Sequence, residues 1–127
     1  MDTLLPWVAV VDDEEAIRRA LLRLLRSAGI EARAFAGGAD LLAALRDGAP
    51  YCAVLDMHMP GMSGCELQAR LARDAPDTGV VVVTGHHSAE LQARAMQGRP
   101  VAYLLKPMND RLLLEAIAAA RAAWRHA

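Results

Sequence analysis

Short apolar runs alternate with longer amphipathic segments along the whole chain. Residues 7–11 form a continuous apolar run, as expected for a parallel strand that is covered on both faces. From Glu14 onward the apolar residues recur every three or four positions, which indicates a helix. The expected buried face of this helix carries Ile17, Leu21, Leu24, Leu25 and Ala28. Gly29 stands where that helix should end, because glycine readily adopts the left-handed conformation of a helix C-terminus.

The same alternation then repeats along the rest of the chain. Strands are expected at 30–35, 52–56, 80–84 and 103–106, the first of them nearer a sheet edge because its pattern is more alternating. Helices are expected within 38–48, from Ser63, from Ser88 to about Gln97, and from about Asn109 to the C-terminus. Ser63 and Glu66 have the spacing of a capping box. Strand–helix units in series imply a parallel sheet with right-handed crossovers and helices on both faces, so residues 1–127 are interpreted as one α/β domain.

Composition agrees with one domain and removes several function classes. A chain of 127 residues that is 54% hydrophobic can bury a core without disulfides or a metal. A formal net charge of -1 argues against non-specific binding to nucleic acid or to an anionic membrane surface. Cys52 and Cys65 form no CxxC motif, so a reduced, cytoplasmic compartment is expected. The apolar segment 4–11 lacks the basic lead-in of a signal peptide and is too short to span a membrane.

Polar side chains stand where four of the expected strands end. Asp12 and Asp13 follow the first strand, Asp56 ends the third, Thr84 ends the fourth, and Lys106-Pro107 ends the fifth. Each residue alone has an ordinary explanation, such as helix capping for the first two. Ligands of open α/β sheets, however, bind beyond the carboxyl ends of the strands. The sequence therefore predicts one crevice that combines three carboxylates, a hydroxyl and an amine.

The chemistry of that crevice follows from its charges. Clustered carboxylates repel one another, so at least one pKa rises unless a cation is bound. Mg²⁺ suits such a cluster, since it prefers one or two carboxylates together with waters and phosphate oxygens. Lys106 and Thr84 can contact phosphate oxygens, and Asp56 can act as a nucleophile that forms an acyl phosphate. Phosphoryl transfer mostly requires this kind of positioning and charge neutralisation.

These residues resemble a known family when they are taken together. Asp12-Asp13, Asp56, Thr84 and Lys106-Pro107, with Pro60-Gly61 after the middle aspartate, resemble the receiver domain of two-component response regulators. The resemblance covers nearly the whole chain and implies a flavodoxin-like (βα)5 fold, a doubly wound parallel sheet with strand order 2-1-3-4-5. It implies a phosphoacceptor signalling switch that catalyses only its own phosphotransfer and autodephosphorylation.

The resemblance assigns expected roles residue by residue. Asp56 resembles the phosphoacceptor, which receives a phosphoryl group from a histidine kinase or a histidine phosphotransfer protein. Asp13 and Asp56, with the backbone carbonyl of His58, resemble the Mg²⁺ ligands, and Asp12 would act partly through water. The acidic set of this family thus implies Mg²⁺ as the cofactor.

Another group of residues resembles the switch machinery of the family. Thr84 and Lys106 resemble the pair that senses the phosphoryl group and completes the catalytic set with the phosphoacceptor. Tyr103 matches the aromatic switch residue that turns inward when Thr84 moves. Pro107 matches a proline that is frequently cis in this family. The implied mechanism is a population shift between two states of one domain.

The resemblance also bears on partners. The face from Ser88 to Trp124 corresponds to the usual homodimerisation and output surface, although its charges equally fit a solvated face. No direct nucleic-acid binding and no membrane contact are expected of this domain. Thr84-Gly85-His86 resembles a subgroup whose receivers often precede a helix-turn-helix domain, so the chain is interpreted as a stand-alone bacterial receiver or a fragment of a longer regulator. Arg99-Pro100 departs from the usual small residue before the fifth strand.

Three alternatives remain beside this interpretation. An aspartyl-phosphate phosphatase uses similar residues, but its D-x-D motif near the start is absent, because His58 stands two residues after Asp56. A degenerate receiver that serves only as a scaffold is disfavoured by the intact residue set. The histidines at 58, 86 and 87 suggest a transition metal, yet no spacing such as HxxxH supports it. His58 and His86 also match positions that tune phosphoryl lifetime in the family.

Overall fold

The computed structural model describes residues 5–86 and 88–124. His87, one of the three histidines noted above, lies outside them, as do residues 1–4 and 125–127. The strands are β1 (Val8–Val11), β2 (Ala32–Phe35), β3 (Cys52–Asp56), β4 (Gly79–Thr84) and β5 (Ala102–Leu105). The helices are α1 (Glu15–Ser27), α2 (Gly38–Ala44) with the short 3₁₀ turn η1 (Leu45–Asp47), α3 (Gly64–Asp74), α4 (Ala89–Gln97) and α5 (Asp110–Ala123).

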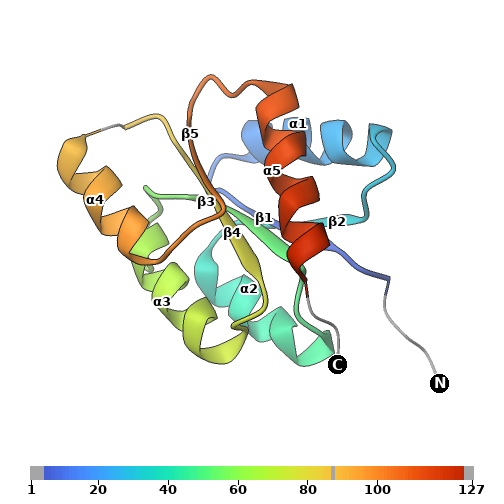
Figure 1. Cartoon of the computed structure of the whole chain (residues 1–127), viewed down its shortest axis with the longest axis horizontal. Helices are drawn as coiled ribbons and strands as arrows, with labels where there is room; N and C mark the ends of the chain where they lie inside the picture. Colours follow the sequence, from blue (N-terminus) through green and yellow to red (C-terminus); the bar gives the residue numbers. More distant parts are fainter. Residues whose placement is uncertain (1–4, 87, 125–127) are drawn as a thin grey trace.

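The strands form one parallel sheet in the order β2-β1-β3-β4-β5, which confirms the predicted topology and the edge position of β2. Helices α1 and α5 cover one face, and α2, α3 and α4 cover the other (Figure 1). Successive strand residues point to opposite faces, so Val8 and Val10 pack under α1 and α5, whereas Ala9 and Val11 pack on the other side. Because both faces of β1 and β3 are covered, these strands are buried throughout, and their only polar residue is Asp56 at the end of β3.

Local signals set the starts of three helices and the end of a fourth. The capping box of α3 is present, since Ser63 Oγ accepts from the Glu66 N–H and a Glu66 carboxylate oxygen accepts from the Ser63 N–H. Ser88 and Asn109 cap α4 and α5 with their side chains. Gly29 has a φ of 78°, which confirms its predicted role at the end of α1.

Several predicted strand boundaries differ from the structure by one or two residues. The second strand begins at Ala32 instead of residue 30, because the Ile30 N–H donates to the Leu25 carbonyl and closes the end of α1. The fifth strand runs from Ala102 to Leu105, so Lys106 follows the strand rather than ending it.

Arg99, which departs from the small residue usual in the family, has a φ of 53°, a strained conformation for a residue with a side chain. Within the described residues, no helix combines the length and the apolar character needed to cross a membrane.

Candidate functional site

Three aspartates meet at the carboxyl ends of β1 and β3. Asp12 and Asp13 follow β1, Asp56 is the last residue of β3, and β1 and β3 are neighbours in the sheet. One carboxylate oxygen from each residue lies within 4.8 Å of the others. Asp12 and Asp56 are only 3% and 5% exposed, whereas Asp13 is open to solvent. The predicted carboxylate cluster is therefore present, with two of its members buried.

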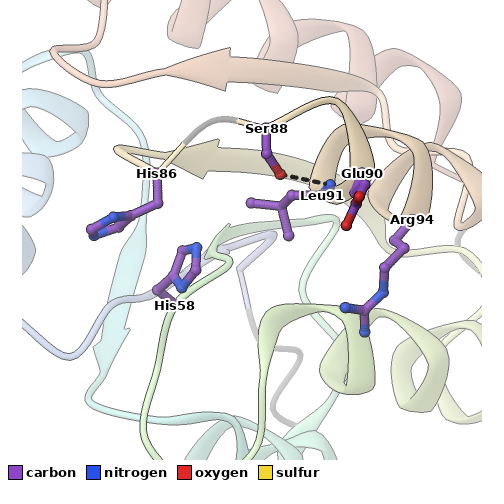
Figure 2. Close-up of a pocket in the computed structure, with 6 residues that line it drawn as sticks. All are labelled: His58, His86, Ser88, Glu90, Leu91 and Arg94. Carbon is purple, nitrogen blue, oxygen red and sulfur yellow. Dashed lines mark hydrogen bonds between the residues drawn. The ribbon is translucent and has the colours of Figure 1, made fainter.

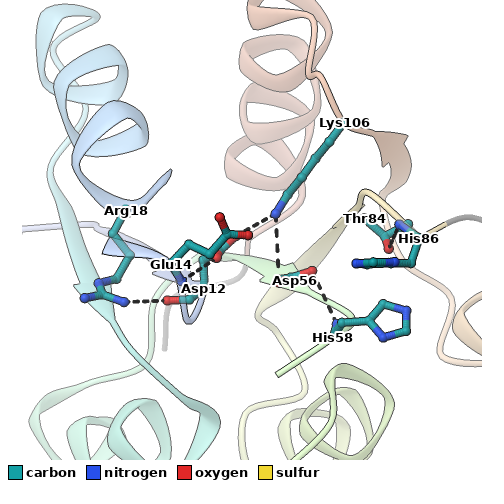
Figure 3. A network of polar contacts seen from close by, with 8 residues as sticks. All are labelled: Asp12, Glu14, Arg18, Asp56, His58, Thr84, His86 and Lys106. Carbon is teal, nitrogen blue, oxygen red and sulfur yellow. Dashed lines mark hydrogen bonds and ion pairs between the residues drawn. The ribbon is translucent and has the colours of Figure 1, made fainter. Parts of the chain in front are cut away.

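Lys106 supplies the balancing positive charge. Its Nζ lies 3.0 Å from Asp12 Oδ2 and 3.9 Å from Asp56 Oδ2 (Figure 3). The Lys106 N–H donates to the Thr84 carbonyl at 2.9 Å, which holds the residue in place just beyond β5. Partial burial lowers the pKa of Lys106, but the hydrogen bond and charge of Asp12, with the charge of Asp56, outweigh it and raise the pKa. Lys106 thus stays an ammonium ion between two carboxylates.

The pKa of Asp56 is raised, chiefly because burial disfavours the carboxylate. The His58 N–H, which donates to Asp56 Oδ1 at 3.3 Å, and the Lys106 charge act in the opposite direction. The charges of Asp12 and Asp13 raise the pKa further. The site thus holds a buried carboxyl whose ionised form is only partly compensated by the protein itself.

Thr84 and Tyr103 lie on the neighbouring strands β4 and β5. Thr84 is fully buried, and its Oγ1 accepts a hydrogen bond from the His86 N–H at 3.1 Å. Tyr103 is half-buried and packs against the core on the side of α2, α3 and α4. Burial raises the pKa of the Tyr103 hydroxyl, with a smaller contribution from Cys65. Thr84 and Lys106 therefore lie side by side, joined by the hydrogen bond between their backbones. Tyr103 lies on β5 opposite Val82 of β4.

The carboxylates and Lys106 open into a cavity of about 290 Å³. Its walls are formed by Asp13, Glu14, Asp56, His58, Gly85, His86 and Lys106. The Lys106–Pro107 peptide bond beside it is cis, as the sequence resemblance implied. The predicted site residues that line this cavity are Asp13, Asp56, His58, His86 and Lys106, and Asp12 contacts it through its ion pair with Lys106.

Sequence reasoning missed two residues that hold this site. Arg18 Nη1 donates to the Asp12 carbonyl at 2.8 Å, so α1 fixes the backbone that carries the first aspartate. A Cβ on Gly64 would lie 2.7 Å from the Asp56 carbonyl oxygen and 2.8 Å from Met57 Cα. Only glycine allows α3 to approach the end of β3 this closely. A glycine directly after the N-cap Ser63 was the available signal, but its meaning depends on tertiary contact.

Comparison with known proteins identifies the family. Residues 8–118 match the response regulator receiver domain. The chain belongs to this family. As a receiver domain it is 39% identical over 113 residues to nodulation protein W of Bradyrhizobium diazoefficiens, covering 89% of this chain and 50% of that protein. It is 36% identical over 115 residues to the transcriptional regulatory protein FixJ of Azorhizobium caulinodans, covering 88% of this chain and 53% of that protein.

Solved structures agree with this assignment. The receiver domain superimposes on the crystal structure of FixJ-N with a TM-score of 0.88 and 30% identity, covering 98% of this chain and all of that one at 100%. A CheY-like receiver domain protein from Methanospirillum hungatei gives a TM-score of 0.87 at 29% identity, covering 94% and 97% of the two chains. The fold and the signalling family are therefore established, which sets aside the phosphatase alternative. The chain spans about half the length of the curated relatives that it matches.

Proposed function

We propose that this receiver domain accepts a phosphoryl group on Asp56 from a histidine kinase or a histidine phosphotransfer protein, in a Mg²⁺-dependent reaction. The observation that carries the proposal is the convergence of three aspartate oxygens within 4.8 Å, with Lys106 Nζ at 3.0 and 3.9 Å from two of the carboxylates. Family membership supports it, and so do the relatives named as transcriptional regulators. The two free cysteines fit a reducing cytoplasm.

The carboxylate set fits Mg²⁺ because all its donors are hard oxygens, and because a buried like-charge cluster needs a cation. Asp13, Asp56 and the His58 carbonyl would hold the ion, with Asp12 acting through water. When bound, Mg²⁺ would neutralise charge on the carboxylates and on the phosphoryl oxygens.

The chain's own residues suggest how transfer proceeds. The His58 N–H holds Asp56 Oδ1, which leaves Oδ2 directed toward the Lys106 ammonium. An Asp56 oxygen would attack the phosphorus, the phosphorus–nitrogen bond to the donor histidine would break, and that nitrogen would keep the electron pair. Lys106 and Thr84 would then bind phosphoryl oxygens, and the fully buried Thr84 hydroxyl would have to turn toward Asp56 to donate its proton. That movement would change the packing of Tyr103 on the adjacent strand.

The face formed by α4, β5 and α5 is the proposed surface for output or homodimerisation. Met96, Leu105 and Leu112 come from these three elements and are 49%, 48% and 43% exposed. Apolar side chains at this level of exposure suit a contact that forms reversibly. Size-exclusion chromatography with light scattering, before and after phosphorylation, should detect a dimer if this face mediates one.

Intact-protein mass spectrometry tests the phosphoacceptor. After incubation with Mg²⁺ and acetyl phosphate, the wild type should gain one phosphoryl group, which hydroxylamine should remove. Asp56→Asn should gain none, because shape is kept and the nucleophile is lost. Asp40→Asn, an exposed aspartate of α2, serves as the matched control and should label like the wild type. A labelled Asp56→Asn protein would contradict the assignment, and absence of label from both acetyl phosphate and phosphohistidine donors would favour the scaffold alternative.

A further inference from the structure

Two histidines from different loops lie side by side above the carboxylate cavity. His58 follows β3 and His86 follows β4, and their ring centroids are 4.5 Å apart with an interplanar angle of 62° (Figure 2). Both side chains are exposed. The His58 N–H donates to Asp56 Oδ1, and the His86 N–H donates to Thr84 Oγ1. The backbone of each histidine is therefore held by a residue of the candidate site.

The separation of the rings suits shared coordination of one ion. An imidazole nitrogen binds Zn²⁺ at about 2.0–2.1 Å, which places the ring centroid about 3.2 Å from the metal. Two such rings at a nitrogen–metal–nitrogen angle of about 90–110° have centroids about 4.5–5.2 Å apart. The observed 4.5 Å falls at the lower end of that range. Small ring rotations would therefore direct one nitrogen from each histidine at a common point.

The surroundings provide room and charge for such an ion. The histidine pair lines both the 290 Å³ cavity over the carboxylates and a second cavity of about 470 Å³ along α4. Glu90 lines the second cavity with its carboxylate, and Arg94 lines it on the same helix (Figure 2). Water can reach both cavities and complete the coordination. Imidazole favours borderline transition metals, whereas the neighbouring aspartates favour Mg²⁺, so the two sites would select different ions.

We propose that the imidazoles of His58 and His86 bind one borderline divalent transition-metal ion of the Zn²⁺ class. The ion joins the β3–α3 loop to the β4–α4 loop across the mouth of the carboxylate cavity. This metal site does not depend on the proposed phosphotransfer. Its consequence does: an ion that links the two loops slows the arrival of a phosphoryl group at Asp56.

Titration of the full chain with Zn²⁺ by calorimetry, in excess Mg²⁺, tests the site. The wild type should bind one Zn²⁺, and His58→Gln and His86→Gln should each weaken binding about tenfold or more, because each removes one of two protein ligands. The double variant keeps every aspartate and reports binding by carboxylates alone. His126→Gln is the control and should bind like the wild type. In the wild type, NMR signals of both rings should shift at one equivalent of Zn²⁺.

Three results would overturn the metal site. They are wild-type affinity in the two single variants, an equal affinity in the double variant, and a loss caused by His87→Gln but not by His58→Gln. The consequence is tested with acetyl phosphate, where Zn²⁺ should slow labelling of the wild type but not of the double variant. Equal rates with and without Zn²⁺ would refute the loop-linking effect. If the wild type takes no label even without Zn²⁺, the proposed function fails, while the titration still decides the metal site.

Discussion

Strand β3 carries a buried ionisable side chain at each end, and the two ends differ in what burial does to them. Burial raises the pKa of the Cys52 thiol to about 12, and it also raises the pKa of the Asp56 carboxyl. A thiol with a raised pKa stays neutral and packs as an apolar group. The Asp56 carboxyl is buried as well, and its ionised form is stabilised only by the His58 N–H and the Lys106 charge. Burial thus keeps the thiol at the start of the strand neutral, and it disfavours the ionised carboxylate at the end of the strand.

The surroundings of the two ends follow the same division. Near Cys52, buried Trp7 and Tyr51 are covered by guanidinium groups, with Arg33 4.7 Å from the Trp7 ring and Arg121 5.5 Å from the Tyr51 ring. Those cations rest on aromatic faces and bury no charge. At the Asp56 end, by contrast, the buried groups are polar. The packing at the amino end of the sheet therefore stabilises the fold. The buried polar groups at the carboxyl end form the candidate site and lower the stability of the fold.

The largest expected effect is on the aromatic end. Trp7→Ala should lower the free energy of unfolding by about 3–5 kcal/mol, because it removes a buried ring that packs against Phe35. Within the described residues the Trp7 Nε1 has no hydrogen-bond partner, so the loss is one of apolar packing and of the contact with Arg33. Urea denaturation measures it. Leu5→Ala is the control, since Leu5 is 69% exposed and should change stability by less than about 0.5 kcal/mol. Similar urea midpoints for the two variants would contradict the proposal that aromatic packing at the amino end stabilises the fold.

A smaller effect is expected where α3 meets the end of β3. Gly64→Ala should cost about 1–3 kcal/mol, because its Cβ would press on the backbone of Asp56 and Met57. Gly85→Ala should cost less than about 0.5 kcal/mol, since its Cβ would lie at an ordinary 3.7 Å from the Lys106 side chain. Thermal unfolding of the two variants provides the comparison. An unperturbed Gly64→Ala protein would show that the close approach is not required.

The carboxyl end should respond to acid in the opposite sense from an ordinary ion-paired aspartate. The folded pKa of Asp56 is raised above 3.8, so its stabilising, protonated form is lost as pH rises from 3.8 through the folded pKa. In the absence of divalent cations, Asp56→Asn should therefore be more stable than the wild type at neutral pH. The difference should shrink toward about pH 4. A wild type that is the more stable protein at neutral pH without divalent cations would contradict this.

The amino end should respond to alkali. The Cys52 pKa rises from 9.0 to about 12 in the folded state, so the unfolded state ionises first and stability falls as pH rises above 9.0. At pH 10 the wild type should have lost on the order of 1 kcal/mol relative to Cys52→Ala, after subtraction of their difference at neutral pH. Denaturant titrations at the two pH values check this. A pH-independent difference would mean that the thiol ionises equally in both states.

The sequence sufficed for what local pattern determines. Continuous apolar runs located β1 and β3, and the alternating pattern placed β2 at an edge. Polar residues at strand ends identified Asp13, Asp56 and Lys106 of the cavity wall. Ser63 and Glu66 predicted the start of α3 because a capping box is entirely local.

What the sequence did not reveal depends on contacts between distant segments. The hydrogen bond to the Asp12 carbonyl comes from Arg18, a residue outside the apolar face that periodicity predicts for α1. The pairing of His58 with His86 joins two loops whose histidines have no informative spacing along the chain. Such features arise from the orientation of loops on the finished sheet, which periodicity does not encode.

The hydrogen bond from the Gly64 N–H to the Met57 carbonyl, at 3.2 Å, ties together the two ends of the loop between β3 and α3. The Ser63–Glu66 capping box lies next to this hydrogen bond, so the base of the loop is held by both interactions. The loop can then be lengthened at its exposed tip, Pro60–Gly61, at small cost to the sheet, since the entropy of closing a loop grows slowly with its length. Inserted peptides should be tolerated at this tip, which makes it an attachment point next to an otherwise fixed cavity.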